Sequence, residues 1–468
     1  MKILVINVSV RPESKVIFIP LGLAYVASAI KRHGYKLEIL DLDAERPSGE
    51  YIIQYLKNNK FDVVCMGCIV TGYKHIKQLA RLIKQVNPDT KIIVGNSVAS
   101  SIPEVLLTNT ETDIAVLGEG DITITEVLDA LRLSRNLKDI QGICYKEDGK
   151  IIKNLPRQPI GNIDTIPFPD WELFDMDKYI ESCSKYVVRD PLPVPREEIK
   201  ALAISTARGC TFRCTFCYQV FRDIKYRYIS APVLVQEMKR LKEKYQINYF
   251  MFNDDLTFAS KSHVCEMAQC LLQEDLSIYW LATCRANLFK NESDVKLVKQ
   301  LKAAGCIGLG YALESASPEI LEMMNKKIDL KDFSKQSHIL ERSGLTSWTS
   351  IVFGYPIETK ESIKKTIDCC IENDIYPSVG YLLPQPATPM YEYAVQHGFI
   401  KDEEEYLLSL GDRQDLRLNM TGMSNNEFQD AVHDAMQECN KRLKLNLQNN
   451  SLIKTGYYRS SKKILSEL

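Results

Sequence analysis

The chain has 468 residues, 45% of them hydrophobic and 25% charged, an ordinary composition for a globular protein of two or three domains. Its formal net charge of −1 provides no bulk attraction to nucleic acid or to an anionic membrane, and no apolar run is as long as a membrane span. We therefore expect no membrane partner, and the composition does not favour nucleic acid, although it leaves a sequence-specific RNA contact open.

The N-terminal sequence MKILVINVSV favours a first β-strand, because it lacks a basic leader followed by a cleavage site of small residues. The 14 cysteines are unevenly spaced and many adjoin apolar residues, unlike the disulfide framework of a secreted protein. These features indicate a protein of the reducing cytoplasm.

Residues 1–145 alternate short apolar runs with amphipathic stretches, a pattern typical of buried parallel strands joined by helices. Helical patterns at 21–33 and 74–86 end near Gly34 and Pro88. The five expected strands span residues 3–8, 37–41, 62–66, 91–95 and 113–117. This order predicts a doubly wound, Rossmann-like α/β domain whose ligand lies at the carboxyl ends of its strands.

Prolines between Pro156 and Pro195 interrupt any periodicity, so residues 146–200 are expected to form a linker. The alternation resumes over 201–400, which predicts a partial (βα)6 barrel with its function on the loops that leave the strands. The expected strands span residues 201–206, 247–252, 278–283, 306–312, 347–353 and 377–383. Residues 401–468 are polar and predict a helical C-terminal region.

Three cysteines, Cys210, Cys214 and Cys217, follow the first expected barrel strand within eight residues. Thiolates are the usual ligands of iron–sulfur clusters and of structural zinc. A structural zinc site needs a fourth cysteine or histidine, and the nearest histidine downstream is His263. Three thiol ligands leave one coordination position open to a substrate or cosubstrate. The alternative is that the three thiols only pack.

The motif Cys210-x-x-x-Cys214-x-x-Cys217, followed by Tyr218, resembles the signature of radical S-adenosylmethionine (SAM) enzymes. The resemblance implies a four-iron, four-sulfur cluster on these cysteines, with the amino and carboxylate groups of SAM on the fourth iron. It also implies an electron donor such as flavodoxin or ferredoxin, and a 5′-deoxyadenosyl radical that abstracts hydrogen from a small-molecule substrate.

Residues after the later strands match the SAM contacts of this family. The resemblance assigns an ammonium contact to the Asp254–Asp255 pair, a carboxylate contact to Arg285 and an adenine contact to Gly354. The full implied SAM set is Tyr218, Asp254, Asp255, Arg285, Glu314, Ser315 and Gly354. The alternative for each of them alone is a capping or solvated residue.

The front domain resembles the cobalamin-binding branch of the family, in the stretches at 20–35, 67–96 and 117–121. Glycines at the strand ends suit the close approach of a large flat ligand. The implied cobalamin contacts are Gly67, Cys68, Thr71, Gly72, Gly95, Asn96, Ser97, Gly118, Glu119 and Gly120.

The chain departs from many cobalamin proteins in its histidines, because none of the six lies in an Asp-x-His-x-x-Gly element. We therefore expect cobalamin without a histidine ligand, its lower face empty, occupied by water or shielded by a side chain. His263, His338 and His433 lie in polar helical patterns and are expected at the surface. Cys65-x-x-Cys68 is either a redox pair or, as we favour, two packed thiols.

The leading hypothesis is a cobalamin-dependent radical SAM enzyme that methylates an unactivated carbon of a small molecule. A second hypothesis keeps the same cofactors but ends in oxidative cyclisation or rearrangement. Radical SAM chemistry without cobalamin is a third. A non-catalytic binding protein on a degenerate scaffold is the fourth, and the intact cysteine trio argues against it.

Overall fold

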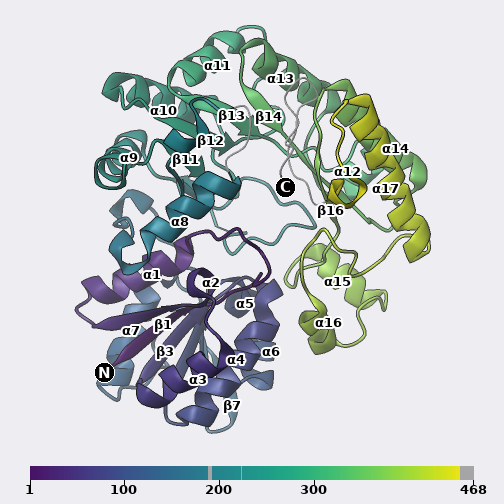
Figure 1. Ribbon diagram of the computed structural model, residues 1–468. Coiled ribbons are helices and arrows are strands. Elements are labelled where there is room, and N and C mark those ends of the chain that lie inside the picture. The colour runs from purple at the N-terminus through teal and green to yellow at the C-terminus, as the bar shows by residue number, and fades with distance from the viewer. Residues whose placement is uncertain (188–191, 223, 454–468) are drawn as a thin grey trace. The chain divides into compact units, whose positions relative to one another are not determined.

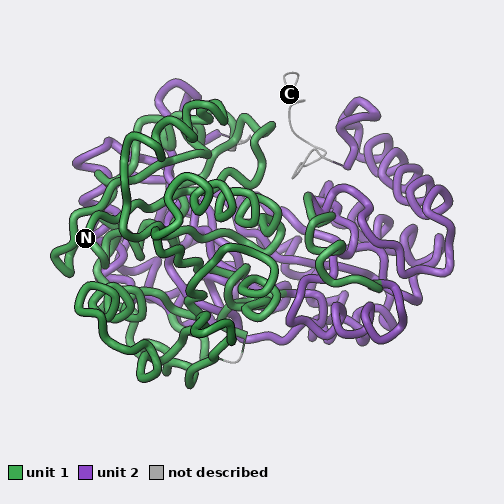
Figure 2. Tube along the Cα trace, turned by 90° about the horizontal axis from the view of Figure 1, so that it is seen from below, with its two compact units in different colours: residues 1–187, 218–227, 400–411 green, residues 188–217, 228–399, 412–468 purple. Residues whose placement is uncertain are grey.

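The computed structural model describes residues 1–187, 192–222 and 224–453 of the chain. It divides into two compact units, shown in different colours in Figure 2. Unit 1 contains residues 1–187, 218–227 and 400–411, and unit 2 contains residues 188–217, 228–399 and 412–468. Two short stretches that lie after the first barrel strand, residues 218–227 and 400–411, therefore belong to unit 1.

Unit 1 is built on a seven-stranded sheet in the order β2-β1-β3-β4-β5-β6-β7. The first five strands in chain order are parallel and coincide with the five expected apolar runs. The strands are β1 (Ile3–Asn7), β2 (Leu37–Asp41), β3 (Val63–Gly67), β4 (Lys91–Gly95), β5 (Ile114–Val116), β6 (Ile143–Glu147) and β7 (Lys150–Lys153). This is the doubly wound arrangement that the alternation predicts.

The expectation that residues 146–153 belong to a linker is wrong. β6 and β7 form an antiparallel hairpin that adds two strands to the first sheet. The turn is Asp148-Gly149, and both residues have positive φ angles, 50° and 74°. This dipeptide is a strong signal for a two-residue hairpin turn, so the hairpin was detectable in the sequence.

Helices cover both faces of this sheet (Figure 1). α1 packs against α7, and α3 packs against α4. The helices of unit 1 are α1 (Leu21–Arg32), α2 (Leu42–Glu45), α3 (Gly49–Asn58), α4 (Tyr73–Val86), α5 (Asn96–Ser101), α6 (Pro103–Asn109), α7 (Gly120–Arg132), α8 (Met176–Ser182) and α16 (Glu403–Ser409). Their apolar sides fill one core with the strands, which includes Val5, Ala27 and Val127.

Unit 2 contains a five-stranded parallel sheet in the order β14-β13-β12-β11-β8, and a separate parallel pair, β15-β16. These strands are β8 (Ala201–Ile204), β11 (Tyr249–Phe252), β12 (Tyr279–Thr283), β13 (Cys306–Gly310), β14 (Thr346–Trp348), β15 (Ser350–Phe353) and β16 (Ser378–Tyr381). Two short strands, β9 (Ala207–Arg208) and β10 (Arg227–Tyr228), lie outside the main sheet. The six expected strands are all present, in a partial barrel.

The expected strand at 347–353 is split in two at Thr349. The Thr349 hydroxyl accepts a hydrogen bond from Leu313 N and donates one to Tyr311 O. β14 pairs with β13, whereas β15 pairs with β16 and bridges back to Glu314 through Ile351. The bend at Thr349 therefore connects the five-stranded sheet, which ends at β14, to the β15–β16 pair.

The helices of unit 2 form an arc outside the strands (Figure 1). They are α9 (Ala231–Tyr245), α10 (Lys261–Glu274), α11 (Asp294–Ala303), α12 (Pro318–Met323), α13 (Leu330–Arg342), α14 (Lys360–Glu372), α15 (Pro389–Gln396) and α17 (Asn425–Arg442). The predicted helical C-terminal region contributes α17, which packs on α14, and its last residues, 454–468, lie outside the described part. Trp280 is fully buried and donates from Nε1 to Ala304 O, so this face of β12 packs against the helix layer.

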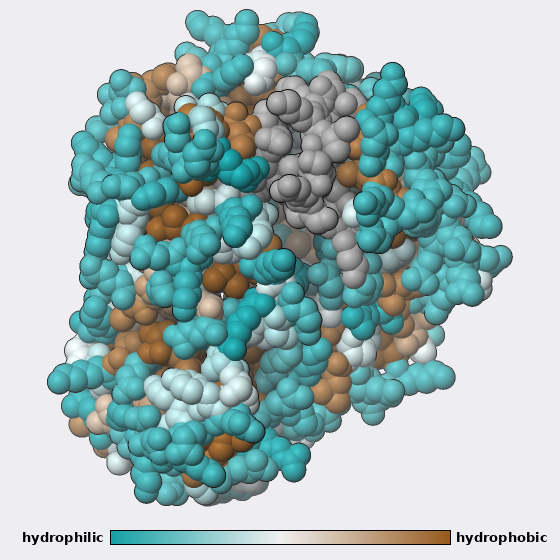
Figure 3. Space-filling model, viewed as in Figure 1, coloured by the Kyte–Doolittle hydropathy of each residue, from teal (hydrophilic) through white to brown (hydrophobic). Residues whose placement is uncertain are grey.

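Hydrophilic residues dominate the face of the molecule shown in Figure 3, and apolar residues are scattered among them. In the described part of the chain, no helix combines the length and the apolar character needed to cross a membrane.

Candidate active site

The cysteine loop leaves the first barrel strand in unit 2. Cys210 and Cys214 are each 9% exposed, and Cys217 is half-buried. The loop is anchored at Thr215, whose N donates to Met324 O at 2.9 Å and whose hydroxyl lies 2.9 Å from the hydroxyl of Tyr355. All fourteen cysteines are free thiols, so no disulfide competes for these three.

The three thiols are not arranged as a zinc site. No group of three or more His, Cys, Asp or Glu side chains among the described residues converges on a single ion. A closed zinc site needs such convergence, whereas in a four-iron cluster each thiolate binds a different iron. Burial raises the pKa of Cys214, and the cations Lys326 and Arg285 act against this rise. These cations favour a negatively charged group on the cysteines.

Asp254 and Asp255, which follow β11, differ in their surroundings. The Asp254 carboxylate accepts hydrogen bonds from Thr206 N at 2.7 Å, Ala207 N at 3.0 Å and the Thr257 hydroxyl at 3.0 Å. Both of its oxygens are therefore engaged by neighbouring loops, including the loop that leads to the cysteines. This arrangement fits a positioning role better than a SAM contact.

Asp255 is exposed, and no described residue donates a hydrogen bond to its carboxylate. The surrounding protein, with a smaller contribution from the Asp254 charge, raises the pKa of Asp255 to about 6. An exposed carboxylate in a low-dielectric setting attracts an ammonium group more strongly than one in bulk water. Of the two aspartates, Asp255 is the one able to receive a ligand.

Arg285 follows β12 and is only 7% exposed. Its guanidinium lies 3.1 Å from the centre of the Phe212 ring in the cysteine loop, and Nη2 donates to Lys327 O. Its Nε has no hydrogen-bond partner although it is buried. An unsatisfied buried donor costs about 1–3 kcal/mol, so this atom is poised for an acceptor that the chain does not supply. A carboxylate fits this donor.

Glu314 follows β13, has a φ of 63° and is 6% exposed. Its Oε1 accepts hydrogen bonds from Lys326 Nζ at 3.3 Å and from the Ser350 hydroxyl at 3.5 Å, while its buried Oε2 has no partner. Arg285 and Glu314 thus each keep one unsatisfied atom at the same carboxyl-end edge. An unpaired acceptor beside an unpaired donor fits the hydroxyl and carboxylate groups of SAM.

Two other expected SAM residues have structural roles. The Ser315 side chain is 1% exposed, lies 3.4 Å from the Thr366 hydroxyl of α14 and accepts from Ser317 N. Gly354 has a φ of 117°, so a side chain there would be strained. Its N donates to Glu358, whose pKa burial raises to about 7. The sequence analysis missed this buried glutamate.

Tyr218 lies in unit 1, although it directly follows the cysteine motif. Its hydroxyl is hydrogen-bonded to Ser100 and Ser101 at the end of α5, and burial raises its pKa to about 12. These hydrogen bonds tie Tyr218 to the end of α5, and its contact with SAM stays a prediction.

The expected cobalamin residues of unit 1 gather at the carboxyl ends of β3, β4 and β5. Gly67 lies opposite Gly95 in the parallel register, and Asn96 has a φ of 67°. Ser97 accepts a hydrogen bond from Val70 N at 2.8 Å, which joins the loops after β3 and β4. A Cβ added at Gly95 or Gly118 would meet no atom within 4 Å. The backbone at this edge is bare and open, as a flat ligand requires.

Three further members of the set are tied into the fold. Gly72 packs tightly against Cys68, because a Cβ at Gly72 would lie 2.7 Å from the Cys68 sulfur. Thr71 lies between them in a 3₁₀ turn at Val70–Gly72. Cys68 is buried and its pKa is raised to about 12, as is that of Cys65, so both are inert packed thiols in this structure.

The Glu119 side chain is held by other parts of unit 1. Its carboxylate accepts from Arg227 Nη1 at 2.9 and 3.1 Å and from Ile160 N at 2.7 Å. Arg227 is 7% exposed, and its guanidinium lies over the Phe221 ring. Gly120 begins α7 beside it. Sequence reasoning missed Arg227, because nothing local links it to a loop 108 residues earlier.

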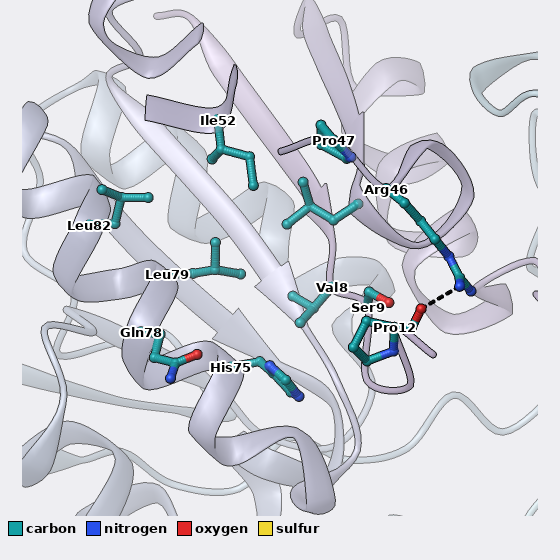
Figure 4. A pocket seen from close by; sticks show the side chains of 11 residues that line it. Val8, Ser9, Pro12, Arg46, Pro47, Ile52, His75, Gln78, Leu79 and Leu82 are labelled. Atoms are coloured by element: carbon teal, nitrogen blue, oxygen red, sulfur yellow. Dashed lines mark hydrogen bonds between the residues drawn. The ribbon is translucent and has the colours of Figure 1, made fainter. Parts of the chain in front are cut away.

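A cavity of about 370 Å³ lies in unit 1 beside the end of β1 (Figure 4). Its wall is mostly apolar, with Val8, Leu79 and Leu82 among the lining residues, and His75 of α4 also lines it. The buried Nε2 of His75 has no hydrogen-bond partner, and burial lowers the pKa of the ring. The imidazole is therefore held neutral in a mainly apolar surrounding.

The prediction that His263 lies at the surface is wrong. His263 is 1% exposed and stacks on Tyr228 with ring centres 3.7 Å apart. Desolvation lowers its pKa to about 4, so the ring packs as a neutral aromatic group. His338 is exposed and His433 is half-buried. The polar helical pattern concealed the buried side of α10.

Two protein-family models match different parts of the chain. The family model of the B12 binding domain matches residues 9–128, and that of the radical SAM superfamily matches residues 204–370. The uncharacterized methyltransferase PH0819 of Pyrococcus horikoshii is 32% identical over 384 residues, which cover 81% of this chain and 79% of the relative.

Two other relatives differ in the reactions that their names give. The anaerobic magnesium-protoporphyrin IX monomethyl ester cyclase of Rubrivivax gelatinosus is 26% identical, over 74% of this chain and 61% of the relative. The cytidylyl-2-hydroxyethylphosphonate methyltransferase of Streptomyces wedmorensis is 25% identical, over 87% of this chain and 83% of the relative. Both transfer and cyclisation chemistry therefore occur among these relatives.

The fold is shared with the radical SAM methyltransferase TsrM from Kitasatospora setae, solved with cobalamin and a [4Fe–4S] cluster. The TM-score is 0.68 at 20% identity, and the match covers 85% of this chain and 78% of that one.

A B12 binding domain followed by a partial barrel with three cysteines after its first strand defines enzymes that combine two cofactors with SAM. This chain belongs to the cobalamin-binding radical SAM family, in which methyltransferases are prominent. Its cofactors are a 4Fe–4S cluster, SAM and cobalamin.

Proposed function

We propose that this enzyme transfers a methyl group to an unactivated carbon of a small molecule. The observation that carries the proposal is the set of unsatisfied buried atoms, Arg285 Nε and Glu314 Oε2, in the same unit as the cysteine loop. These atoms fit SAM, and the front domain belongs to a B12-binding family. The names of two of the three relatives described above support methyl transfer.

When bound, the cofactors supply one-electron cleavage of SAM and a transferable methyl group. Cys210, Cys214 and Cys217 hold the cluster. Arg285, which is only 7% exposed, would bind the SAM carboxylate, and Asp255 would bind its ammonium group.

Glu314 would accept a hydrogen bond from the SAM ribose through its unpaired Oε2, and Gly354 would let the backbone pass the adenine. Asp254, Ser315 and Tyr218 act as positioning residues through the contacts described above. The electron donor is a small redox protein such as flavodoxin or ferredoxin.

The open edge of unit 1, with Gly67, Gly95 and Gly118, would hold cobalamin. The remaining members of the expected set, Cys68, Thr71, Gly72, Asn96, Ser97, Glu119 and Gly120, shape the loops around this edge. We propose that no histidine binds cobalt, because none of the six lies in an Asp-x-His-x-x-Gly element.

Oxidative cyclisation is the second candidate, favoured by the similarity to the Rubrivivax gelatinosus cyclase. The two reactions use SAM differently. Methyl transfer consumes one SAM as methyl donor, giving S-adenosylhomocysteine, and a second as radical source, giving 5′-deoxyadenosine. Cyclisation needs only the radical source.

The deciding experiment measures both SAM products from anaerobic, cluster-reconstituted, cobalamin-loaded enzyme with a low-potential reductant. We expect S-adenosylhomocysteine and 5′-deoxyadenosine from the wild type. The Cys210→Ala variant forms no 5′-deoxyadenosine, and at most one S-adenosylhomocysteine per cobalamin, because the methyl group is then not passed on. A wild type that forms 5′-deoxyadenosine but no S-adenosylhomocysteine contradicts methyl transfer and favours cyclisation. Enzyme that cleaves SAM without binding cobalt supports cobalamin-free chemistry, and no cleavage at all supports a binding protein.

A further inference from the structure

Arg413 lies along the last barrel strand, β16, within unit 2. Its carbonyl oxygen accepts a hydrogen bond from Tyr381 N at 2.7 Å, and its Nη2 donates to the Ser378 hydroxyl at 3.1 Å. The backbone and the head group of Arg413 are therefore both fixed to the same strand.

Gly380 provides the space for this side chain. A Cβ at Gly380 would lie 2.7 Å from Arg413 Nη1 and 3.1 Å from its Cγ and Cδ. The φ angle of Gly380 is not in the left-handed region, so the glycine is required by the close approach and not by backbone conformation. The strand is thus built to let the arginine lie flat across it.

The side chain of Arg413 lies on the same face as the expected SAM site. It contacts Ser378 and Gly380, which are two residues apart and so share one face of β16. In the parallel register, Ser378 lies opposite Ser350 of β15. The Ser350 hydroxyl in turn donates to Glu314 at 3.5 Å. A continuous path of contacts therefore links Arg413 to the SAM-binding edge.

The charge of Arg413 has no counter-ion in the described part of the chain. Its side chain is half-buried and makes one hydrogen bond, to a neutral hydroxyl. By contrast, Arg417 pairs with Asp415 at 3.2 Å, and Lys326 pairs with Glu314. A partly desolvated guanidinium with open donors is a binding group for a planar oxyanion.

We propose that Arg413 binds an anionic group of the substrate, a carboxylate or a phosphate. The proposal rests on the proposed function, because it takes the Glu314 edge as the place of reaction. Arg413 comes from the segment after α16, so the C-terminal region supplies a specificity-determining residue to the barrel. The substrate class is then an organic acid or a phosphorylated or phosphonate compound.

The test titrates methylphosphonate, and separately acetate, into anaerobic enzyme loaded with cluster, cobalamin and SAM without reductant. SAM fills its own site, so binding reports on a second anion site. We expect Arg413→Gln to weaken binding at least about tenfold and Arg413→Lys to weaken it less, because lysine keeps the charge but loses the fork. Arg417→Gln is the matched control and keeps wild-type affinity. The tighter of the two probes identifies the anion.

A labelling experiment covers the case in which the variants do not fold. Phenylglyoxal modifies Arg413 of the wild type, and methylphosphonate protects it, as mass spectrometry of the peptide shows. Equal affinity in wild type and Arg413→Gln, loss of affinity in Arg417→Gln, or labelling that no anion reduces would each overturn the proposal.

SAM cleavage in the presence of reductant separates this inference from the proposed function. Failure of cleavage in the wild type rejects the function while the anion titration still reports on Arg413. Normal cleavage with unchanged anion binding in Arg413→Gln rejects the inference alone.

Discussion

At the residue scale, the candidate site contains buried polar atoms that the protein leaves unsatisfied. Arg285 Nε and Glu314 Oε2 have no partner among the described residues. Each such atom costs about 1–3 kcal/mol when no ligand is present. Asp254, only one strand away, has both oxygens occupied. Unsatisfied atoms thus mark Arg285 and Glu314 as candidate ligand-binding residues, whereas the satisfied Asp254 has a structural role.

Asp255 gives a pH-dependent prediction. Its pKa is raised to about 6, and only the ionised carboxylate attracts the SAM ammonium group. SAM affinity is therefore expected to be constant above about pH 7 and to fall as pH decreases through 6. Equilibrium dialysis of the unreduced enzyme with SAM between pH 5 and 8 measures this. Asp255→Asn is expected to have weak affinity without the inflection, and an unchanged inflection in this variant would exclude Asp255 as its source.

Asp254 gives a prediction about protein stability instead of SAM affinity. Asp254→Asn replaces one acceptor oxygen by an NH₂ group facing the backbone donors of Thr206 and Ala207. We expect a loss of about 1–3 kcal/mol in the free energy of unfolding, measured by urea denaturation, since buried donors lose their acceptor. Asp255→Asn is the matched control and is expected to unfold at the wild-type urea concentration. Equal stability of the two variants would refute the positioning role of Asp254.

His75 tests the expectation of cobalt without a histidine ligand. Its ring lines the apolar cavity of Figure 4 and has a lowered pKa. We expect His75→Gln to leave the absorption spectrum of bound cobalamin unchanged, and the electron paramagnetic resonance spectrum of its cobalt(II) form without nitrogen splitting. Nitrogen splitting in the wild type that disappears in His75→Gln would show the expectation to be wrong.

At the element scale, the packing of β13 against β14 requires a glycine at position 310, because the Trp348 side chain lies against it. A Cβ at Gly310 would lie 2.3 Å from the Trp348 Nε1 and 2.4 Å from Cε2. Gly310→Ala must displace the indole, and we expect it to destabilise the protein by about 1–3 kcal/mol. Gly22→Ala in α1 is the control, because nothing lies within 4 Å of its added Cβ. Thermal unfolding of both variants measures the difference, and equal midpoints would contradict the close packing.

The elements themselves were largely predictable. The five strands of the front sheet and the six barrel segments follow from short apolar runs, because parallel strands are buried on both faces. The β6–β7 hairpin was not predicted although Asp148-Gly149 marks its turn, because its two short strands adjoin a proline-rich stretch without periodicity. The bend at Thr349 depends on hydrogen bonds to Tyr311 and Leu313, which no local pattern encodes.

In the candidate site, too, local sequence patterns were predictable and contacts between distant segments were not. The cysteines could be predicted because their ligand spacing is local, and the strand-end positions because parallel strands align their ends. Which of Asp254 and Asp255 remains open, and where Tyr218 points, depends on contacts between distant segments. Arg227, Glu358 and Arg413 were missed for this reason.

At the scale of the whole molecule, two segments that follow the first barrel strand in the sequence belong to unit 1. Residues 218–227 are attached by the buried ion pair of Arg227 with Glu119. Residues 400–411 are attached through Glu404, which accepts from Tyr73 at 2.9 Å and pairs with Lys77. The last segment of unit 1 is therefore supplied by residues 400–411, after most of unit 2.

The ion pair gives a prediction of stability. Glu119→Gln leaves the Arg227 cation buried without its counter-charge, which costs about 3–5 kcal/mol. We expect a lower midpoint of thermal unfolding in this variant, and partial recovery in Glu119→Leu/Arg227→Met, where both charges are removed. Glu404→Gln is the comparison, because Lys77 is more exposed and its pair contributes less. A Glu119→Gln protein as stable as the wild type would show that the pair is dispensable.

The composition of unit 1 also limits how the gene can be divided. The boundary between the units falls after the last motif cysteine, since Cys217 belongs to unit 2 and Tyr218 to unit 1. A fragment that ends at residue 187 lacks Arg227 and Glu404. Glu119 then loses its buried ion pair, and Tyr73 loses its hydrogen bond to Glu404. The cobalamin-binding part is therefore not a detachable module that could be expressed alone or exchanged between relatives by one splice. An exchange that keeps unit 1 whole has to carry its three separate segments together, residues 1–187, 218–227 and 400–411.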